Sequence, residues 1–181
     1  INNHILNREL NFEINENTPQ NEIDDTILSI KSIEHITSVY NVPAELDVAE
    51  TSGVLFSAYT LSYVHEGYTL KITSGRAFKE NEENVAVVPE VLKDFNSESQ
   101  RINKIDGKTL VGKNLVFADE SGKEHKLKIV GVYNTSDPIF TGNQILIPRN
   151  SLIEFNNEVI ANAKGSTSIT SDKAYKILVD D

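Results

Sequence analysis

Hydrophobic and polar residues alternate near the start of the chain, as expected for a β-strand with one buried face. In RELNFEI, residues 8–14, the apolar side chains of Leu10, Phe12 and Ile14 fall on the same face. The segment AELDVAE, residues 44–50, reads as a second strand. A helical segment lies between the two. The opening therefore predicts a strand–helix–strand unit in which the helix covers a small sheet.

The helical segment spans residues 16–36 and begins with helix start signals. Thr18 can cap the helix, and Pro19 suits its first position. Acidic residues follow, where the helix dipole is positive. Four isoleucines then recur at helical spacing and form one apolar stripe, namely Ile23, Ile27, Ile30 and Ile33.

From about residue 51 the chain is rich in β-branched and aromatic residues, which favours strands. The clearest signal is a hairpin over residues 114–133, whose turn contains Gly122 to supply a positive φ. Pro89 is expected to start a short helix over residues 90–95, and residues 151–163 form a second predicted helix. Further strands are predicted at residues 54–64, 68–72, 85–89, 144–148 and 174–181.

The composition fits a globular protein of one or two domains. The chain has 181 residues, of which 39% are hydrophobic and 24% are charged. A chain of this size buries roughly 70% of its unfolded surface, so it needs no disulfide or metal to fold. It contains no cysteine, which excludes thiol catalysis and thiolate zinc sites. No apolar run reaches the roughly 18 residues that a membrane-spanning helix requires.

The charge balance excludes one class of partner. The chain has 17 basic and 27 acidic residues, a net charge of −10, and the two signs are interspersed. Such a surface repels phosphate backbones and anionic lipid headgroups, so we expect no nucleic-acid partner.

No residue pattern indicates a catalytic or metal centre. His4, His35, His65 and His125 are far apart and form no HExxH motif, so metal binding is the less favoured interpretation. The acidic run KENEEN, residues 79–84, lacks the ligand spacing of a calcium loop and is better explained as a solvated turn. No nucleophile motif or glycine-rich phosphate loop is present. We therefore predict no cofactor and no enzymatic activity, although folding could assemble a carboxylate pair that a sequence does not reveal.

The stretch SGRAF has an arginine directly after a glycine. We expect Gly75 to turn the chain, Arg76 to pair with a nearby carboxylate or carbonyl, and Phe78 to be buried against residues 85–88 or the 114–133 hairpin. The alternative is an arginine held for a phosphate or a partner. A phosphate site is disfavoured because only one glycine is present and a strand follows where a helix N-terminus would be needed.

These segments occur in a recognisable order: G-R-x-F, an acidic turn, VAVV, a glycine that starts a hairpin, VGV, and a strand that ends in proline. In this order the chain resembles the MacB-like extracytoplasmic core domain of FtsX-type ABC transporter permeases. The resemblance extends over nearly the whole chain. The family motif residues, for which it implies a structural role, are Gly75, Arg76, Phe78, Gly112, Val130, Gly131, Val132 and Pro148.

The resemblance implies an α+β fold with two lobes. Residues 1–50 and 144–181 would form a discontinuous membrane-near lobe that shares one sheet, and residues 51–143 would form an inserted outer lobe. The family usually continues after the last strand with a further helix and strand, which are missing after Asp181. Because the chain begins at Ile1 and has no methionine, we expect it to be a fragment of a longer protein.

The resemblance also implies a location and partners. The domain would lie outside the cell membrane, between the first two of four transmembrane helices. Its partners would be a cytoplasmic ATP-binding subunit, a second permease copy, and an extracellular adaptor or cell-wall hydrolase. The implied function is to relay ATP-driven movement to export of an antimicrobial peptide, a drug or a lipoprotein, or to hydrolase regulation, with a Gram-positive transporter as the leading choice. The competing class is a free-standing extracellular binding module, such as a solute receptor or an adhesin domain.

Overall fold

The structure is a computed structural model that shows a mixed α+β fold, and it confirms the predicted class. The chain divides into two compact units. Unit 1 comprises residues 1–43, 65–68 and 167–181, and unit 2 comprises residues 44–64 and 69–166. Within these units, the structure describes residues 8–15, 17–48, 50–51, 59–79, 81–96, 101–118, 123–136, 139–140, 142–163 and 173–180.

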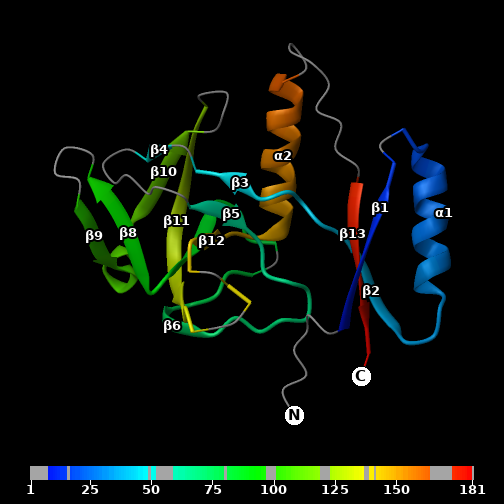
Figure 1. The fold of residues 1–181 in the computed structure, drawn as a ribbon, viewed down its shortest axis with the longest axis horizontal. Coiled ribbons are helices and arrows are strands. Elements are labelled where there is room, and N and C mark those ends of the chain that lie inside the picture. Colours follow the sequence, from blue (N-terminus) through cyan, green and yellow to red (C-terminus); the bar gives the residue numbers. More distant parts are fainter. Residues whose placement is uncertain are drawn as a thin grey trace. The chain divides into compact units, whose positions relative to one another are not determined.

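Unit 1 is a three-stranded antiparallel sheet with one helix against it (Figure 1). The strand order is β1-β13-β2, so the last strand of the chain lies between the first two. The elements are β1 (Glu9–Ile14), α1 (Gln20–Lys31), β2 (Ile36–Asn41) and β13 (Lys173–Val179).

The apolar stripe of α1 forms the core of unit 1. Ile23 is fully buried and clusters with Val39 and Tyr175 from the sheet. The ring of Phe12 stacks on that of Tyr175 with centroids 5.2 Å apart. Partly buried aliphatic side chains complete the cluster, namely Ile14, Ile27, Ile30, Ile36 and Ile177.

Several predictions for the opening segment are wrong in detail. The helix ends at Lys31. The strand that completes the strand–helix–strand unit is β2, at residues 36–41, and not residues 44–50. Two features explain the difference. His35 adopts a φ of 72°, which is incompatible with helix up to residue 36, and the segment ITSVY that follows it is rich in β-branched and aromatic residues. Residues 44–50 instead include β3 (Leu46–Asp47), which pairs in unit 2.

Three side chains also differ from their predicted roles. Pro19 occupies the N-cap position of α1, and no side chain caps the helix, so Thr18 is not the cap. Ile33 is 57% exposed because it lies beyond the helix end and leaves the stripe. Leu10 is also 57% exposed, because it lies on the edge strand β1 and outside the core cluster.

Unit 2 contains a mixed sheet of eight strands (Figure 1). Its main path is β3-β5-β12-β7-β11-β10-β4, and β6 pairs with β11 beside that path. All five residues of β7 are buried, as the uninterrupted apolar run VAVVP predicts. Besides β3, the strands are β4 (Glu50–Thr51), β5 (Thr60–Ser62), β6 (Ile72–Gly75), β7 (Val85–Pro89), β10 (Asn114–Ala118), β11 (Glu124–Tyr133) and β12 (Gln144–Leu146).

The β10–β11 hairpin and the second helix are confirmed. Asn114 pairs with Lys128 and Ala118 pairs with Glu124, in antiparallel register. Gly122, in the predicted turn, lies outside the described residues. The helix α2 (Arg149–Ala163) covers the predicted range.

The strand β12 pairs with β5 and β7, not with the strands of unit 1, so residues 144–146 do not share the sheet expected for them. Its residues Ile145 and Leu146 are fully buried, and the adjacent Ile147 is too. Consecutive buried side chains show that both faces of this strand are covered, and its two edges pair with β5 and β7.

The helix predicted after Pro89 is also wrong. Residues 91–96 form β8 (Val91–Asn96), which pairs with β9 (Arg101–Asp106) in a separate two-stranded sheet. Leu92 is buried, whereas its neighbours Val91 and Lys93 are exposed, as in a strand. The segment is so short that its apolar pattern fits a helix as well as a strand. A short 3-10 helix, η2 (Gly107–Leu110), follows β9.

Two predicted strands are shorter than expected or displaced. The strand predicted at residues 68–72 is replaced by β6, which begins at Ile72. Of residues 54–64, Thr60–Ser62 form β5, and residues 54–58 lie outside the described part of the chain.

No helix in the part of the chain that the structure describes is both long enough and apolar enough to cross a bilayer.

Candidate functional site

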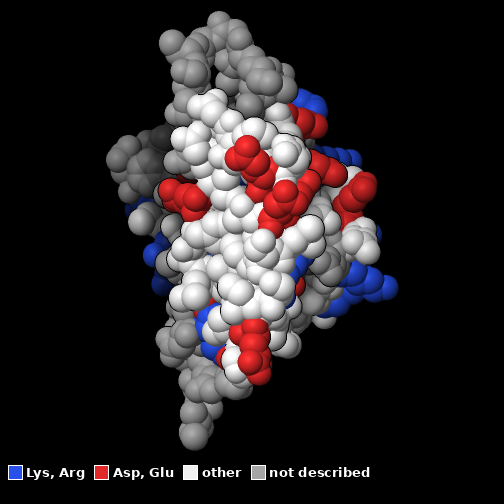
Figure 2. Space-filling model, turned by 90° about the vertical axis from the view of Figure 1, so that its right-hand side faces the viewer, with Lys and Arg blue, Asp and Glu red and all other residues white. Residues whose placement is uncertain are grey.

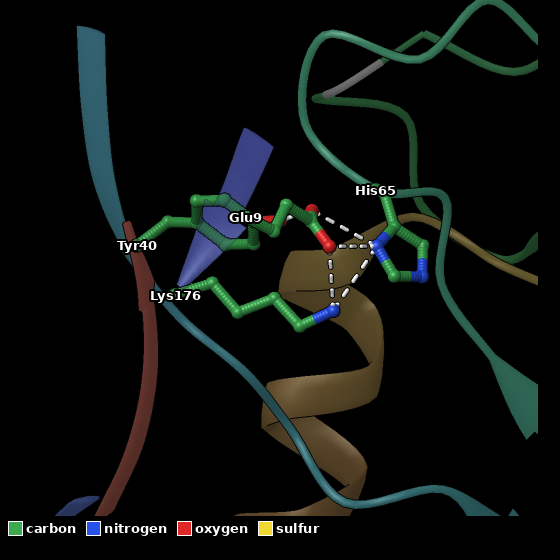
Figure 3. Close-up of polar contacts among 4 residues, drawn as sticks. All are labelled: Glu9, Tyr40, His65 and Lys176. Carbon is green, nitrogen blue, oxygen red and sulfur yellow. Dashed lines mark hydrogen bonds and ion pairs between the residues drawn. The ribbon is translucent and has the colours of Figure 1, made fainter. Parts of the chain in front are cut away.

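A network of charged and polar side chains lies on the face of the unit 1 sheet that points away from α1 (Figure 3). Strand alternation explains its placement. Phe12, Val39 and Tyr175 face the helix, so residues an odd number of positions away on the same strands face the other side. The members are Glu9 from β1, Tyr40 from β2, Lys176 from β13, and His65 from the turn at residues 65–68.

Glu9 is the centre of this network. Its side chain is only 3% exposed, and both of its carboxylate oxygens have partners. Tyr40 donates its hydroxyl to Oε1 over 2.5 Å, and Lys176 donates Nζ to Oε2 over 2.9 Å. The Nδ1 atom of His65 lies 2.9 Å from Oε1 and 2.8 Å from Oε2.

The protonation of His65 follows from these distances. A carboxylate only accepts hydrogen bonds and an ammonium only donates them. The short contacts to Glu9 therefore place the proton on Nδ1. The Nζ atom of Lys176 lies 3.1 Å from Nδ1 because both groups donate to the same carboxylate, that of Glu9. Glu9 thus holds three donors together.

These contacts also set the charge state of Glu9. Burial by itself would raise its pKa, but hydrogen bonds from Tyr40, Lys176 and His65 outweigh that effect and lower the pKa below the ordinary value of 4.5. The carboxylate is therefore ionised at neutral pH, opposite the ammonium of Lys176.

The network fastens the turn at residues 65–68 to the sheet. His65 is one point of attachment. The second is the neighbouring Glu66, whose Oε1 accepts a hydrogen bond from the hydroxyl of Ser38 on β2 over 2.7 Å. Because both oxygens of Glu9 already accept hydrogen bonds, the arrangement orders the backbone and does not offer a free general base.

A second group of residues carries the motif recognised in the sequence. Gly75 on β6 lies directly opposite Gly131 on β11. A Cβ at position 131 would lie 2.0 Å from the carbonyl oxygen of Arg76, and one at position 75 would lie 2.3 Å from that of Val130. Gly75 also has a φ of 70°, which disfavours other residues. Two glycines are needed here because the two backbones approach more closely than side chains allow.

Arg76 makes the local contacts predicted for it. Its guanidinium forms a fork with Glu82, with Nη1 2.8 Å from Oε2 and Nη2 2.5 Å from Oε1. Nη1 also donates to the carbonyl of Ala77 over 3.0 Å. The Arg76 hydrogen bonds, with one from the backbone N–H of Lys79, lower the pKa of Glu82 to about 2. The acidic run at residues 79–84 therefore closes this turn through one of its carboxylates.

The other motif residues are spread over unit 2. Val130 and Val132 are buried in β11 beside the glycine pair, whereas Phe78 is only half-buried. Gly112, with a φ of 85°, donates its N–H to the carbonyl of Ile129 over 2.8 Å. Pro148 lies past the end of β12, where its carbonyl accepts a hydrogen bond in the first turn of α2. The structure thus brings together residues 75–76 and 130–132 and leaves Pro148 apart.

The histidines have separate environments. His35 contacts Asp180, with Nδ1 3.0 Å from Oδ1. His125 packs in a cluster with two phenylalanine rings, with centroid distances of 5.2 Å to Phe117 and 4.7 Å to Phe155. His4 lies outside the described residues. In that described part of the chain, no three His, Asp or Glu side chains are grouped as ligands for a metal ion.

Sequence reasoning missed the Glu9 network. Glu9 and Lys176 alternate with apolar residues on their strands, and this pattern normally marks a solvent-facing side. Among the described residues, His65 in the turn at residues 65–68 contacts both of them. No local sequence signal indicates that contact.

No protein-family model matches the sequence, and no curated protein matches it significantly.

Proposed function

We propose that this chain is the extracellular domain of an FtsX-type ABC transporter permease, with a fold like the MacB core domain. In this role it performs no chemistry. A cytoplasmic subunit hydrolyses ATP, the transmembrane helices move, and the external domain passes that movement to a substrate or a partner. The proposed outcome is export of a peptide, drug or lipoprotein, or control of a cell-wall hydrolase.

The observation that best supports this proposal is the pairing of Gly75 with Gly131. The resemblance rests on the order of short motifs, and two of them, SGRAF and VGV, are far apart in the sequence. They meet in adjacent strands at a contact that excludes any side chain. This contact supports the resemblance better than the order of the motifs alone. Two short motifs that matched by chance would not be expected to lie in contact in the fold.

The charge of unit 1 favours a cationic substrate among the proposed classes. Unit 1 contains 11 of the 27 acidic residues but only 4 of the 17 basic ones. Figure 2 views the side of α1, where Asp and Glu side chains stand on the face and Lys and Arg lie mostly at its margins. Exposed carboxylates on α1 include Glu22, Asp24 and Asp25. Such a field attracts cationic peptides and repels anionic ones.

The proposal is tested first on the full reading frame and the intact protein. We expect four hydrophobic spans, with this segment between the first and the second. We also expect a tagged form to co-purify from membranes with an ATP-binding subunit. In detergent or nanodiscs, cationic peptides should change the ATPase rate of that complex more than anionic peptides of equal length.

The result that would contradict the proposal would instead favour the competing class of protein. A reading frame with a signal peptide or a single anchor, without the four spans and without an associated ATPase, would identify a free-standing extracellular binding module instead.

A further inference from the structure

The turn at residues 65–68 is part of unit 1, although the chain on both sides of it belongs to unit 2. The strand β5 precedes the turn and the strand β6 follows it, and both strands pair in the large sheet of unit 2. Short connections, residues 63–64 and 69–71, join the turn to these strands. The turn is therefore a short loop of the unit 2 chain that is inserted into unit 1.

Polar side chains attach this turn to the sheet of unit 1. The Nδ1 atom of His65 lies 2.9 Å and 2.8 Å from the two carboxylate oxygens of Glu9. The carboxylate of Glu66 accepts a hydrogen bond from the hydroxyl of Ser38 over 2.7 Å. We call these two contacts the clasp. Residues 65–68, all of which the structure describes, form no strand and are not part of the apolar core cluster of unit 1, so the clasp differs in kind from the core and the strand pairing of that unit.

The sheet keeps its buried charges paired when the clasp opens. Glu9, whose side chain is 3% exposed, retains the ammonium of Lys176 and the hydroxyl of Tyr40, and both of these come from the sheet itself. The side chains of His65 and Glu66 are polar, and water solvates them once the turn leaves. Segments that are held by few apolar contacts open locally, at a lower free energy than global unfolding. The clasp is therefore able to open while unit 1 stays folded.

We propose that the clasp is a releasable attachment that couples the movement of unit 2 to unit 1. The chain passes between the two units near residues 43 and 166 as well as at the turn. With the clasp closed, unit 1 holds unit 2 at the turn in addition to these two connections. With the clasp open, the turn moves with unit 2, and the two connections remain. The relay of ATP-driven movement through the clasp rests on the proposed function, whereas the coupling itself is a property of this chain.

A double variant, His65→Ala with Glu66→Ala, removes the clasp and leaves the buried ion pair of the sheet in place. Unlike Glu9→Gln, this clasp variant should therefore keep unit 1 folded. The matched control is Thr69→Ala with Lys71→Ala, because both of these residues are exposed and lie just after the turn. Circular dichroism should show that both double variants keep the native content of secondary structure.

Double electron–electron resonance measures the coupling in the 181-residue chain. The chain has no cysteine, so Ser29→Cys on α1 and Lys126→Cys on β11 place one spin label in each unit, both at exposed positions. We expect a narrow distance distribution in the native background and in the control variant, and a broader one in the clasp variant. A second pair of labels at Ser29 and Glu13, both in unit 1, should give the same distribution in all of these backgrounds.

Amide hydrogen exchange shows whether the clasp opens by itself. The N–H of Tyr68 donates to the carbonyl of His65 over 3.0 Å inside the turn. In the native chain this amide should exchange faster than the amides of β13, which exchange when unit 1 unfolds. The clasp variant should accelerate the exchange of the Tyr68 amide by about tenfold or more and leave that of β13 unchanged.

Equal between-unit distance distributions with and without the clasp would overturn the proposal. So would exchange of the Tyr68 amide that occurs only together with that of β13, because the turn would then be a fixed part of the sheet. A changed distribution within unit 1 in the clasp variant would contradict it as well. If the clasp behaves as predicted but the intact protein associates with no ATP-binding subunit, the proposed function fails and the coupling stands.

Discussion

Replacing Glu9 by glutamine should strongly destabilise unit 1. The substitution keeps the shape of the side chain but removes its charge. It leaves the ammonium of Lys176, whose side chain is 15% exposed, next to a neutral amide. The new NH₂ group also has no acceptor to meet on the side of Lys176 and His65, where both partners donate to the carboxylate in the native protein.

The expected cost follows from burial and charge. Removing one partner of a buried ion pair costs about 3–5 kcal/mol, since the remaining charge is left uncompensated. Here Lys176 keeps some contact with water, and the amide oxygen still accepts one hydrogen bond from Tyr40. We therefore expect Glu9→Gln to lower the free energy of unfolding by about 2–4 kcal/mol.

Urea denaturation followed by circular dichroism gives the total loss, and amide hydrogen exchange of β13 reports on unit 1 separately. Glu13→Gln is the matched control, because Glu13 is on the same strand but exposed, and it should change stability by less than about 0.5 kcal/mol. The double variant Glu9→Leu with Lys176→Met should recover part of the loss, as no buried charge remains. Equal effects of Glu9→Gln and Glu13→Gln would refute the reasoning.

Three further predictions concern Glu9, the glycines of unit 2 and the ion pair of Arg76. The stability difference between the native chain and Glu9→Gln should shrink as the pH falls below about 4.5. Folding lowers the pKa of the Glu9 carboxylate, so its contribution to stability is lost as the group becomes protonated in the folded state. Urea titrations on either side of this pH measure the change. Gly131→Ala should abolish soluble expression or sharply lower the melting temperature, since the new Cβ would lie 2.0 Å from a backbone oxygen. Gly112→Ala is the control. Its Cβ would meet no atom within 4 Å, so it should lower the free energy of unfolding by only about 1–2 kcal/mol, the cost of a left-handed backbone at alanine. Arg76→Ala should return the pKa of Glu82 from about 2 towards 4.5, as read from its carboxyl carbon shift in an NMR titration, and an unchanged pKa would rule out the ion pair as its cause.

The parts of the fold that the sequence predicted are those with a strong local pattern. The buried run at residues 85–89 has no period, but it is short and rich in valine, and both features favour a strand. The hairpin at residues 114–133 alternates with period two. The isoleucine stripe of α1 predicted its buried face for the same reason, except at Ile33, where the helix had already ended.

The parts that were missed depend on contacts distant in the sequence. Residues 90–95 have no decisive period, and their strand state comes from pairing with β9, for which the sequence analysis assigned no element. The Glu9 network likewise requires β1, β2, β13 and a turn from the middle of the chain to meet. By contrast, the fork between Arg76 and Glu82 was predictable, because its partners are six residues apart in one turn.

The central claim, a domain that relays ATP-driven movement, is most directly tested by a distance measurement in the intact transporter. The chain contains no cysteine, so Ser29→Cys, at an exposed position on α1, gives one spin label per copy once cysteines elsewhere in the transporter are removed. Double electron–electron resonance between the two permease copies is recorded without nucleotide and with ATP trapped by vanadate. The account predicts a clear shift of the distance distribution between these two states. Identical distributions, in a preparation that still hydrolyses ATP, would contradict it.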